Sequence, residues 1–186
     1  QDLFERFNQE LKFKILKFAH SEKMISTSAK YIKVFPILDK IQVYHNIPSN
    51  SENPRGAMLW HKDDFGYKSL DLFMIITDVD NNNGPLMVIE EKEKLGIFSK
   101  SNLENLDNNL IGERGKIKSD SFDKKNVNNI LSLKGKRGNA LFIDSFTAYH
   151  KGGHCKSSDR LMLRLSYQTP DSIRVSQKKT LFSEEF

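Results

Sequence analysis

Short apolar segments separated by turn residues run through the chain from about residue 31 onward. β-Branched and aromatic residues are enriched in these segments, and Pro, Asn, Ser and Gly fill the connections. Runs of this length and composition are typical of β-strands, so the pattern predicts a mainly β protein with flanking helices. The predicted strands cover residues 31–35, 41–45, 57–61, 70–79, 86–89, 140–150 and 161–168.

The N-terminal stretch follows a different period. Its apolar side chains recur at helical spacing, so residues 2–18 are predicted to form an amphipathic helix. We expect this helix to cover the outside of the larger sheet; binding a partner or lying on a membrane is the less favoured alternative. The apolar positions are Leu3, Phe4, Phe7, Leu11, Ile15 and Phe18.

The length of the chain limits the number of domains. With 186 residues it can bury a substantial core, but it is too short for two ordinary domains and a linker. We therefore predict one domain over residues 1–186, with a β core from about 31 to 178. Residues 90–128 are charged and rich in asparagine, and they are predicted to form an insertion near the mouth of this core. Such an insertion is either a lid that excludes water or a surface loop without a role.

The tripeptide His61-Lys62-Asp63 directly follows an apolar run that ends in Trp60. A histidine and a carboxylate two residues apart on an extended strand point to the same face, so both can reach one metal ion. Two imidazoles and one carboxylate on one side of an octahedral ion leave three adjacent positions open, whereas zinc more often receives a closed or tetrahedral set. The tripeptide therefore predicts two ligands of a metal site whose third ligand comes from elsewhere in the chain.

A second group of motifs lies downstream. Residues 138–153 read G-N-A-L-F-I-D-S-F-T-A-Y-H-K-G-G, and K-S-S-D-R at 156–160 opens the last predicted strand. Together with W-H-K-D at 60–63 and N-G-P at 83–85, they resemble the phytanoyl-CoA dioxygenase-like branch of the iron(II)/2-oxoglutarate-dependent oxygenases. The resemblance covers roughly residues 40–170.

This resemblance implies a fold, a reaction and a set of site residues. The fold is a double-stranded β-helix, the jelly-roll core of cupin-like proteins. His61, Asp63 and His150 would bind Fe(II), and Arg160 would bind the distal carboxylate of 2-oxoglutarate, for which a planar, permanently charged guanidinium is well suited. Such an enzyme uses O2 to hydroxylate a small or medium organic substrate while 2-oxoglutarate is decarboxylated to succinate and CO2. Asp63 disfavours a halogenase, in which the carboxylate position is vacant so that chloride can bind the iron.

The same segment contains a second histidine–arginine pair that could supply the ligand and the arginine. His154 and Arg164 have the same separation as His150 and Arg160, so they could replace them. His150 is preferred because it ends a predicted strand and is followed by a Lys-Gly pair, as in the family. Arg164 lies four residues beyond Arg160 on a strand and therefore shares its face. It could bind 2-oxoglutarate itself or an anionic substrate, or it could be an edge-facing charge paired with an acidic residue.

The predicted strand at 41–45 offers two further candidates. Gln42 and Tyr44 alternate onto one face of it and could donate hydrogen bonds to 2-oxoglutarate. Packing of Tyr44 in the core is an equally good interpretation, because a tyrosine ring brings a large apolar surface with a single polar tip.

Charge and cysteine content restrict the setting and the partners. The net charge of +5 is spread along the chain, and no basic stripe is interleaved with aromatic residues, so nucleic-acid binding is disfavoured. A lone Cys155 and the lack of a long apolar run favour a cytoplasmic protein without a membrane partner. The expected partner is a small-molecule substrate, anionic if Arg164 or Lys68 lines the pocket, or tethered to a carrier.

The sequence leaves two alternative functions and the oligomeric state undecided. A cupin-like metal protein without 2-oxoglutarate chemistry would retain the histidines but leave Arg160 without an obvious role. A non-catalytic β-helix would serve as a binding module and would bind neither iron nor 2-oxoglutarate. The oligomeric state is not predicted by any pattern in the chain.

Overall fold

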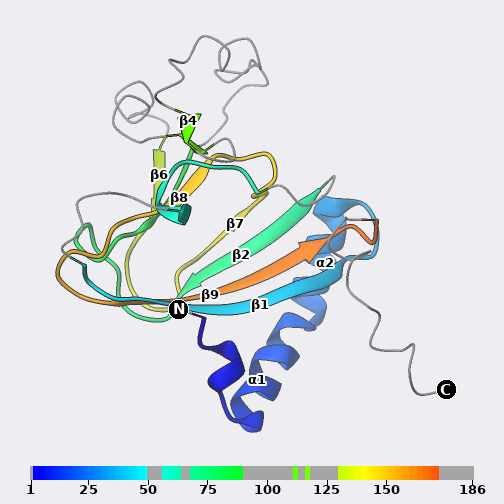
Figure 1. The fold of residues 1–186 in the computed structure, drawn as a ribbon. Helices are drawn as coiled ribbons and strands as arrows, with labels where there is room; N and C mark the ends of the chain where they lie inside the picture. The colour runs from blue at the N-terminus through cyan, green and yellow to red at the C-terminus, as the bar shows by residue number, and fades with distance from the viewer. Residues whose placement is uncertain are drawn as a thin grey trace.

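Two antiparallel β-sheets form the framework of the protein (Figure 1). The computed structural model describes residues 2–49, 56–63, 68–89, 111–112, 116–117 and 130–171. The larger sheet has the strand order β1-β9-β2-β7 and the smaller one the order β6-β3-β8. The mainly β fold with a double-stranded β-helix core, predicted from the sequence, is thereby confirmed.

The strands are short, and neighbours in a sheet are distant in sequence. The larger sheet contains β1 (Ile37–Asn46), β2 (Ser69–Ile75), β7 (Ala140–Ile143) and β9 (Arg160–Gln168). The smaller sheet contains β3 (Leu86–Ile89), β6 (Ile130–Leu133) and β8 (His150–Gly152), and a separate pair is formed by β4 (Ile111–Gly112) and β5 (Lys116–Ile117).

Strand β9 is buried on both of its faces. It lies between β1 and β2 and runs antiparallel to both. On one face, Leu163 and Leu165 belong to the apolar cluster that also contains helix residues. Because side chains alternate along a strand, Arg160 and Arg164 both lie on the opposite face, and both are buried. The interior of the β core therefore contains two guanidinium groups.

Two helices, α1 (Gln9–Ala19) and α2 (Glu22–Ile32), pack against the outer face of the larger sheet. The phenol oxygen of Tyr167 on β9 donates a hydrogen bond of 2.6 Å to the carbonyl of Ala19, which ties the end of α1 to the sheet.

The helix predicted over 2–18 is wrong at its start. A 3-10 turn, η1 (Phe4–Arg6), comes first, and Asn8 then caps α1 by accepting a hydrogen bond of 2.9 Å from the backbone N–H of Leu11.

The strand predicted at 31–35 is also wrong, because residue 31 lies in the last turn of α2. Met24, Ser28 and Ile32 are buried at intervals of four residues along this helix. The apolar residues Met24, Ile25, Ala29 and Ile32 also recur at helical spacing, so the sequence contained the signal for this helix.

Two further predicted strands differ from the structure around the candidate ligands. Residues predicted as a strand at 57–61 begin instead as a 3-10 turn, η2 (Gly56–Met58). Trp60 and His61 are single bridge residues, and His61 pairs with His150. The strand predicted at 140–150 is divided, because Asp144 accepts hydrogen bonds from the backbone N–H groups of Phe146 and Thr147 and so forms a turn. This turn carries the chain from the larger sheet to the smaller one, where His150 begins β8.

The remaining predicted strands are present in the structure and differ from the prediction only in length, if at all. The strand predicted at 41–45 extends over 37–46, and the one at 70–79 ends at Ile75. Most of the predicted insertion at 90–128 lies outside the described residues, so the lid stays a prediction, as does the end of the core at 178. No helix in the described ranges combines the length and apolar character that a membrane crossing requires.

The Asn-Gly-Pro turn contacts the segment that follows His150. Gly84 has a φ of +68°, and a Cβ placed on it would lie 2.5 Å from the backbone oxygen of Gly153. The backbone N–H of Gly153 donates a hydrogen bond of 2.9 Å to the carbonyl of Pro85. Glycine at 84 therefore allows two backbones to meet, and this contact holds the turn before β3 against the end of β8.

We expect Gly84→Ala to destabilise the protein far more than Gly56→Ala. Both glycines have a positive φ, which costs an alanine about 1–2 kcal/mol, but no atom of the described residues lies within 4 Å of a Cβ at Gly56. At Gly84 the backbone clash adds about 1–3 kcal/mol. Urea denaturation followed by circular dichroism measures the free energies of unfolding. Equal losses at the two positions would contradict the importance of the close approach.

Candidate metal centre

Three side chains converge between the two sheets. One candidate ligand atom from each of His61, Asp63 and His150 lies within 4.8 Å of the others. His61 Nε2 is 3.8 Å from Asp63 Oδ1, and the two imidazole rings have their centroids 4.4 Å apart. In the part of the chain that the structure describes, these residues are the one group with this geometry.

The backbone fixes the distance between the two histidines. The N–H of His61 donates to the carbonyl of His150 at 3.1 Å, and the N–H of His150 donates to the carbonyl of His61 at 3.0 Å. This reciprocal pair replaces the strand that the sequence predicted here. His61 and Asp63 thus reach a common point although they do not lie on a regular strand.

Each imidazole is also held through its Nδ1 atom. His61 Nδ1 lies 2.7 Å from the carbonyl of Leu59, and His150 Nδ1 lies 3.1 Å from the carbonyl of Ala148. A carbonyl only accepts, so Nδ1 carries the proton in both rings. Their Nε2 lone pairs are then available to a metal ion, which is the usual arrangement of histidine ligands.

Burial and neighbouring charges set the protonation states. Burial lowers the pKa of His150 to about 4, and the neighbouring His61 acts in the same direction. Burial by itself would raise the pKa of Asp63, but Arg164, followed by His150, outweighs it and brings that pKa to about 2. At neutral pH the site therefore presents a neutral His150 imidazole and an ionised carboxylate. This donor set suits an iron(II) ion with open coordination positions.

Arg160 is buried without a full set of partners. Its Nη2 donates a hydrogen bond of 3.1 Å to Asn46 Oδ1, whereas Nε and Nη1 have no acceptor among the described residues. A Cβ at Gly152, on the strand that begins with His150, would lie 3.6 Å from Arg160 Nη2. Burial lowers the pKa of Arg160, because the charged guanidinium is taken out of water. Unsatisfied buried donors of this kind call for an anionic acceptor.

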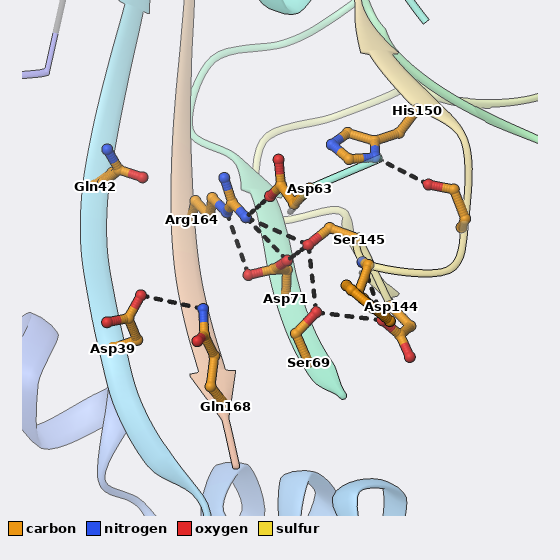
Figure 2. Close-up of polar contacts among 12 residues, drawn as sticks. Asp39, Gln42, Asp63, Ser69, Asp71, Asp144, Ser145, His150, Arg164 and Gln168 are labelled. Atoms are coloured by element: carbon orange, nitrogen blue, oxygen red, sulfur yellow. Dashed lines mark hydrogen bonds and ion pairs between the residues drawn. The ribbon is translucent and has the colours of Figure 1, made fainter. Parts of the chain in front are cut away.

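Arg164 is also buried, but its Nε and Nη2 atoms bind carboxylates of the protein (Figure 2). Its Nη2 lies 2.5 Å from Asp63 Oδ2 and 3.0 Å from Asp71 Oδ2, and its Nε lies 3.2 Å from Asp71 Oδ1. Burial alone would lower the pKa of Arg164. The carboxylate of Asp71, and after it that of Asp63, outweighs burial and holds this pKa above the ordinary arginine value.

The structure does not bring His154 into the cluster. Its Nε2 lies 2.6 Å from the backbone carbonyl of Ser49. Gln42 and Tyr44 do share a face, and the Tyr44 hydroxyl donates to Gln42 Oε1 at 2.6 Å. Lys68 lies over the ring of Tyr31, with Nζ 4.4 Å from the ring centroid.

Sequence reasoning missed Asp71 and Ser145. Asp71 is fully buried on β2, and the Ser145 hydroxyl donates a short hydrogen bond to it. A charged residue between two leucines in an apolar strand was the available signal for Asp71, because such a charge is rarely buried without a partner. No local signal marks Ser145, since the turn after β7 is what places it there.

Comparison with known proteins finds structural likeness only. No sequence-family profile and no curated protein matches the chain. Among solved structures, AviO1 from Streptomyces viridochromogenes Tue57 aligns with a TM-score of 0.55 at 14% identity, over 92% of this chain and 66% of that one. The epimerase SnoN, in complex with Fe3+, alpha ketoglutarate and nogalamycin RO, aligns with a TM-score of 0.58 at 12% identity, over 85% and 59%.

EctD from S. alaskensis, with bound Fe, aligns with a TM-score of 0.50 at 11% identity, over 83% of this chain and 52% of that one. At such identities the likeness shows a shared fold. The chain spans between about half and two thirds of the length of these three proteins.

Removing His150 should abolish metal binding, whereas removing His154 should not. We expect His150→Ala to weaken Ni(II) binding by at least about a hundredfold, the upper end of what loss of an outer partner causes, because a ligand itself is removed. His154→Ala is the matched control and should bind Ni(II) with the affinity of the wild type. Isothermal titration calorimetry on folded protein measures both. Loss of Ni(II) binding in His154→Ala but not in His150→Ala would favour His154 and Arg164 as the site residues.

Proposed function

We propose that this protein is an Fe(II)/2-oxoglutarate-dependent dioxygenase that hydroxylates a small or medium organic substrate. The observation that carries the proposal is a buried arginine with unsatisfied donors on the interior face that also adjoins a two-histidine, one-carboxylate cluster. The cluster offers one face of an octahedral ion, and the arginine offers a cation for a carboxylate that enters with the metal's co-substrate.

Each residue has a defined task in this proposal. His61, Asp63 and His150 hold the Fe(II) ion, and Arg160 binds the distal carboxylate of 2-oxoglutarate through its Nε and Nη1 groups. Fe(II) with 2-oxoglutarate and O2 supplies the oxidising power that inserts oxygen into a substrate C–H bond and releases succinate and CO2. The protein holds the reactants in place and keeps water away.

Arg160 suits 2-oxoglutarate better than Arg164 does. Nε and Nη2 of Arg164 already bind Asp71 and Asp63, so two carboxylates of the protein balance the charge of this guanidinium. Arg160 keeps two donors without a protein acceptor among the described residues. The Tyr44 hydroxyl is engaged with Gln42, so we propose that this pair borders the co-substrate and is not its main contact.

Several finer assignments belong to the same proposal. The likeness to structures that contain iron or alpha ketoglutarate supports this chemistry, and the motifs at 60–63, 83–85 and 138–160 support the phytanoyl-CoA dioxygenase-like branch. Asp63 supports hydroxylation over halogenation. The lone, buried Cys155 suits a cytoplasmic location, which we propose as the setting. Arg164 and Lys68 are engaged within the protein, so neither favours an anionic substrate.

The proposal predicts a charge-transfer band when Fe(II) and 2-oxoglutarate are added to the apo-protein without oxygen. We expect Arg160→Gln to weaken 2-oxoglutarate binding about tenfold to hundredfold, because hydrogen bonds to a charged group are lost. Asp63→Ala should abolish the band. Absorption titration of wild type and variants measures both effects.

The exposed Arg137, whose backbone N–H bonds to Asp78 Oδ1, provides the control as Arg137→Ala, and this variant should titrate like the wild type. If folded, metal-loaded wild type gave no band, the oxygenase proposal would fail. A metal-binding cupin-like protein would then be the better description.

A further inference from the structure

A closed ring of hydrogen bonds surrounds the carboxylate ligand (Figure 2). The backbone N–H of Asp63 donates to the carbonyl of Ser145 at 2.8 Å, and the hydroxyl of Ser145 donates to Asp71 Oδ2. Asp71 accepts two hydrogen bonds from Arg164, and Arg164 Nη2 donates to Asp63 Oδ2 at 2.5 Å. Asp63 is thus held at both its main chain and its side chain.

The ring distinguishes the two oxygens of Asp63. Oδ2 faces Arg164, whereas Oδ1 is the oxygen that lies 3.8 Å from His61 Nε2. A metal ion at the cluster would therefore meet Oδ1 first. Binding through both oxygens would require Oδ2 to leave the guanidinium.

Asp71 keeps the guanidinium in a fixed orientation. It binds Arg164 side-on through Nε and Nη2, which leaves Nη2 aimed at Asp63. Asp71 is fully buried and Arg164 is only 8% exposed, so neither charge is compensated by solvent. Asp71 offsets the arginine charge, and Asp63 therefore keeps enough negative charge to bind a cation.

We propose that Arg164 is a positioning residue that restricts Asp63 to one-oxygen coordination, with Asp71 and Ser145 holding the arginine in place. This inference rests on the metal site of the proposed function, but it does not depend on 2-oxoglutarate. It assigns different tasks to the two arginines of β9. Arg160 binds the co-substrate, and Arg164 positions the metal ligand Asp63.

The first test is Co(II) binding by Arg164→Lys. Lysine keeps the charge but presents a single ammonium group, which cannot hold Asp71 side-on and contact Asp63 as the guanidinium does. We expect Co(II) affinity to fall about tenfold to hundredfold, with an altered visible spectrum because the coordination number changes. Arg137→Lys makes the same change at an exposed arginine outside the site, and it should match the wild type in both measurements.

A second variant protects the test against misfolding, since a single loss of Arg164 leaves Asp71 buried and unpaired. The double variant Arg164→Met/Asp71→Asn removes both charges together. We expect it to fold, as judged by circular dichroism, and to show the same spectral change as Arg164→Lys.

Wild-type affinity and spectrum in Arg164→Lys and in the double variant would overturn the inference, as would wild-type protein that binds no Co(II). A wild type that binds Co(II) but shows no band with Fe(II) and 2-oxoglutarate would remove the oxygenase proposal only. The effect of the Arg164 variants on Co(II) would still decide the role of the arginine.

Discussion

The burial of two guanidinium groups on one face of β9 is the constraint on which the interior depends. A buried charge needs partners, and the two arginines find them differently. Arg164 is satisfied by carboxylates of the protein, one of which is a candidate metal ligand. Among the described residues, Arg160 has one amide acceptor, and its Nε and Nη1 atoms have none. The same sheet face thus contains one completed ion-pair network and one that a ligand must complete.

Backbone contacts between distant segments bring this face and the metal ligands together. The close approach of Gly84 and Gly153 joins the turn before β3 to the end of β8, and the turn after β7 moves the chain between sheets just before His150. Neither feature contributes a candidate metal ligand, although the turn also carries Ser145. Both determine where His150 lies relative to Asp63, so the N-G-P and K-G-G motifs act through geometry.

The sequence predicted the β core and brought His61, Asp63 and His150 forward as candidates, because these features leave local patterns: alternating apolar runs, an H-x-D tripeptide and a histidine after an apolar strand. The strand predicted at 31–35 was wrong because the helical period of α2, carried by Met24, Ile25 and Ile32, continues into its first residues. The sequence-based prediction failed again at 140–150, where the side chain of Asp144 forms a turn within an apolar run. Asp71 and Ser145 depend on strand pairing and on that turn, so only the three-dimensional structure places them beside Asp63.

The reciprocal backbone hydrogen bonds between His61 and His150 make the positions of the two histidines independent of the third ligand. Main-chain atoms set the distance between the two imidazoles, so no neighbouring side chain is needed to maintain it. The identity of the third ligand can then change while the other two keep their positions. A scaffold of this kind can evolve, or be engineered, toward a different metal or a different exchangeable ligand through substitution at a single position, without rebuilding the surrounding sheets.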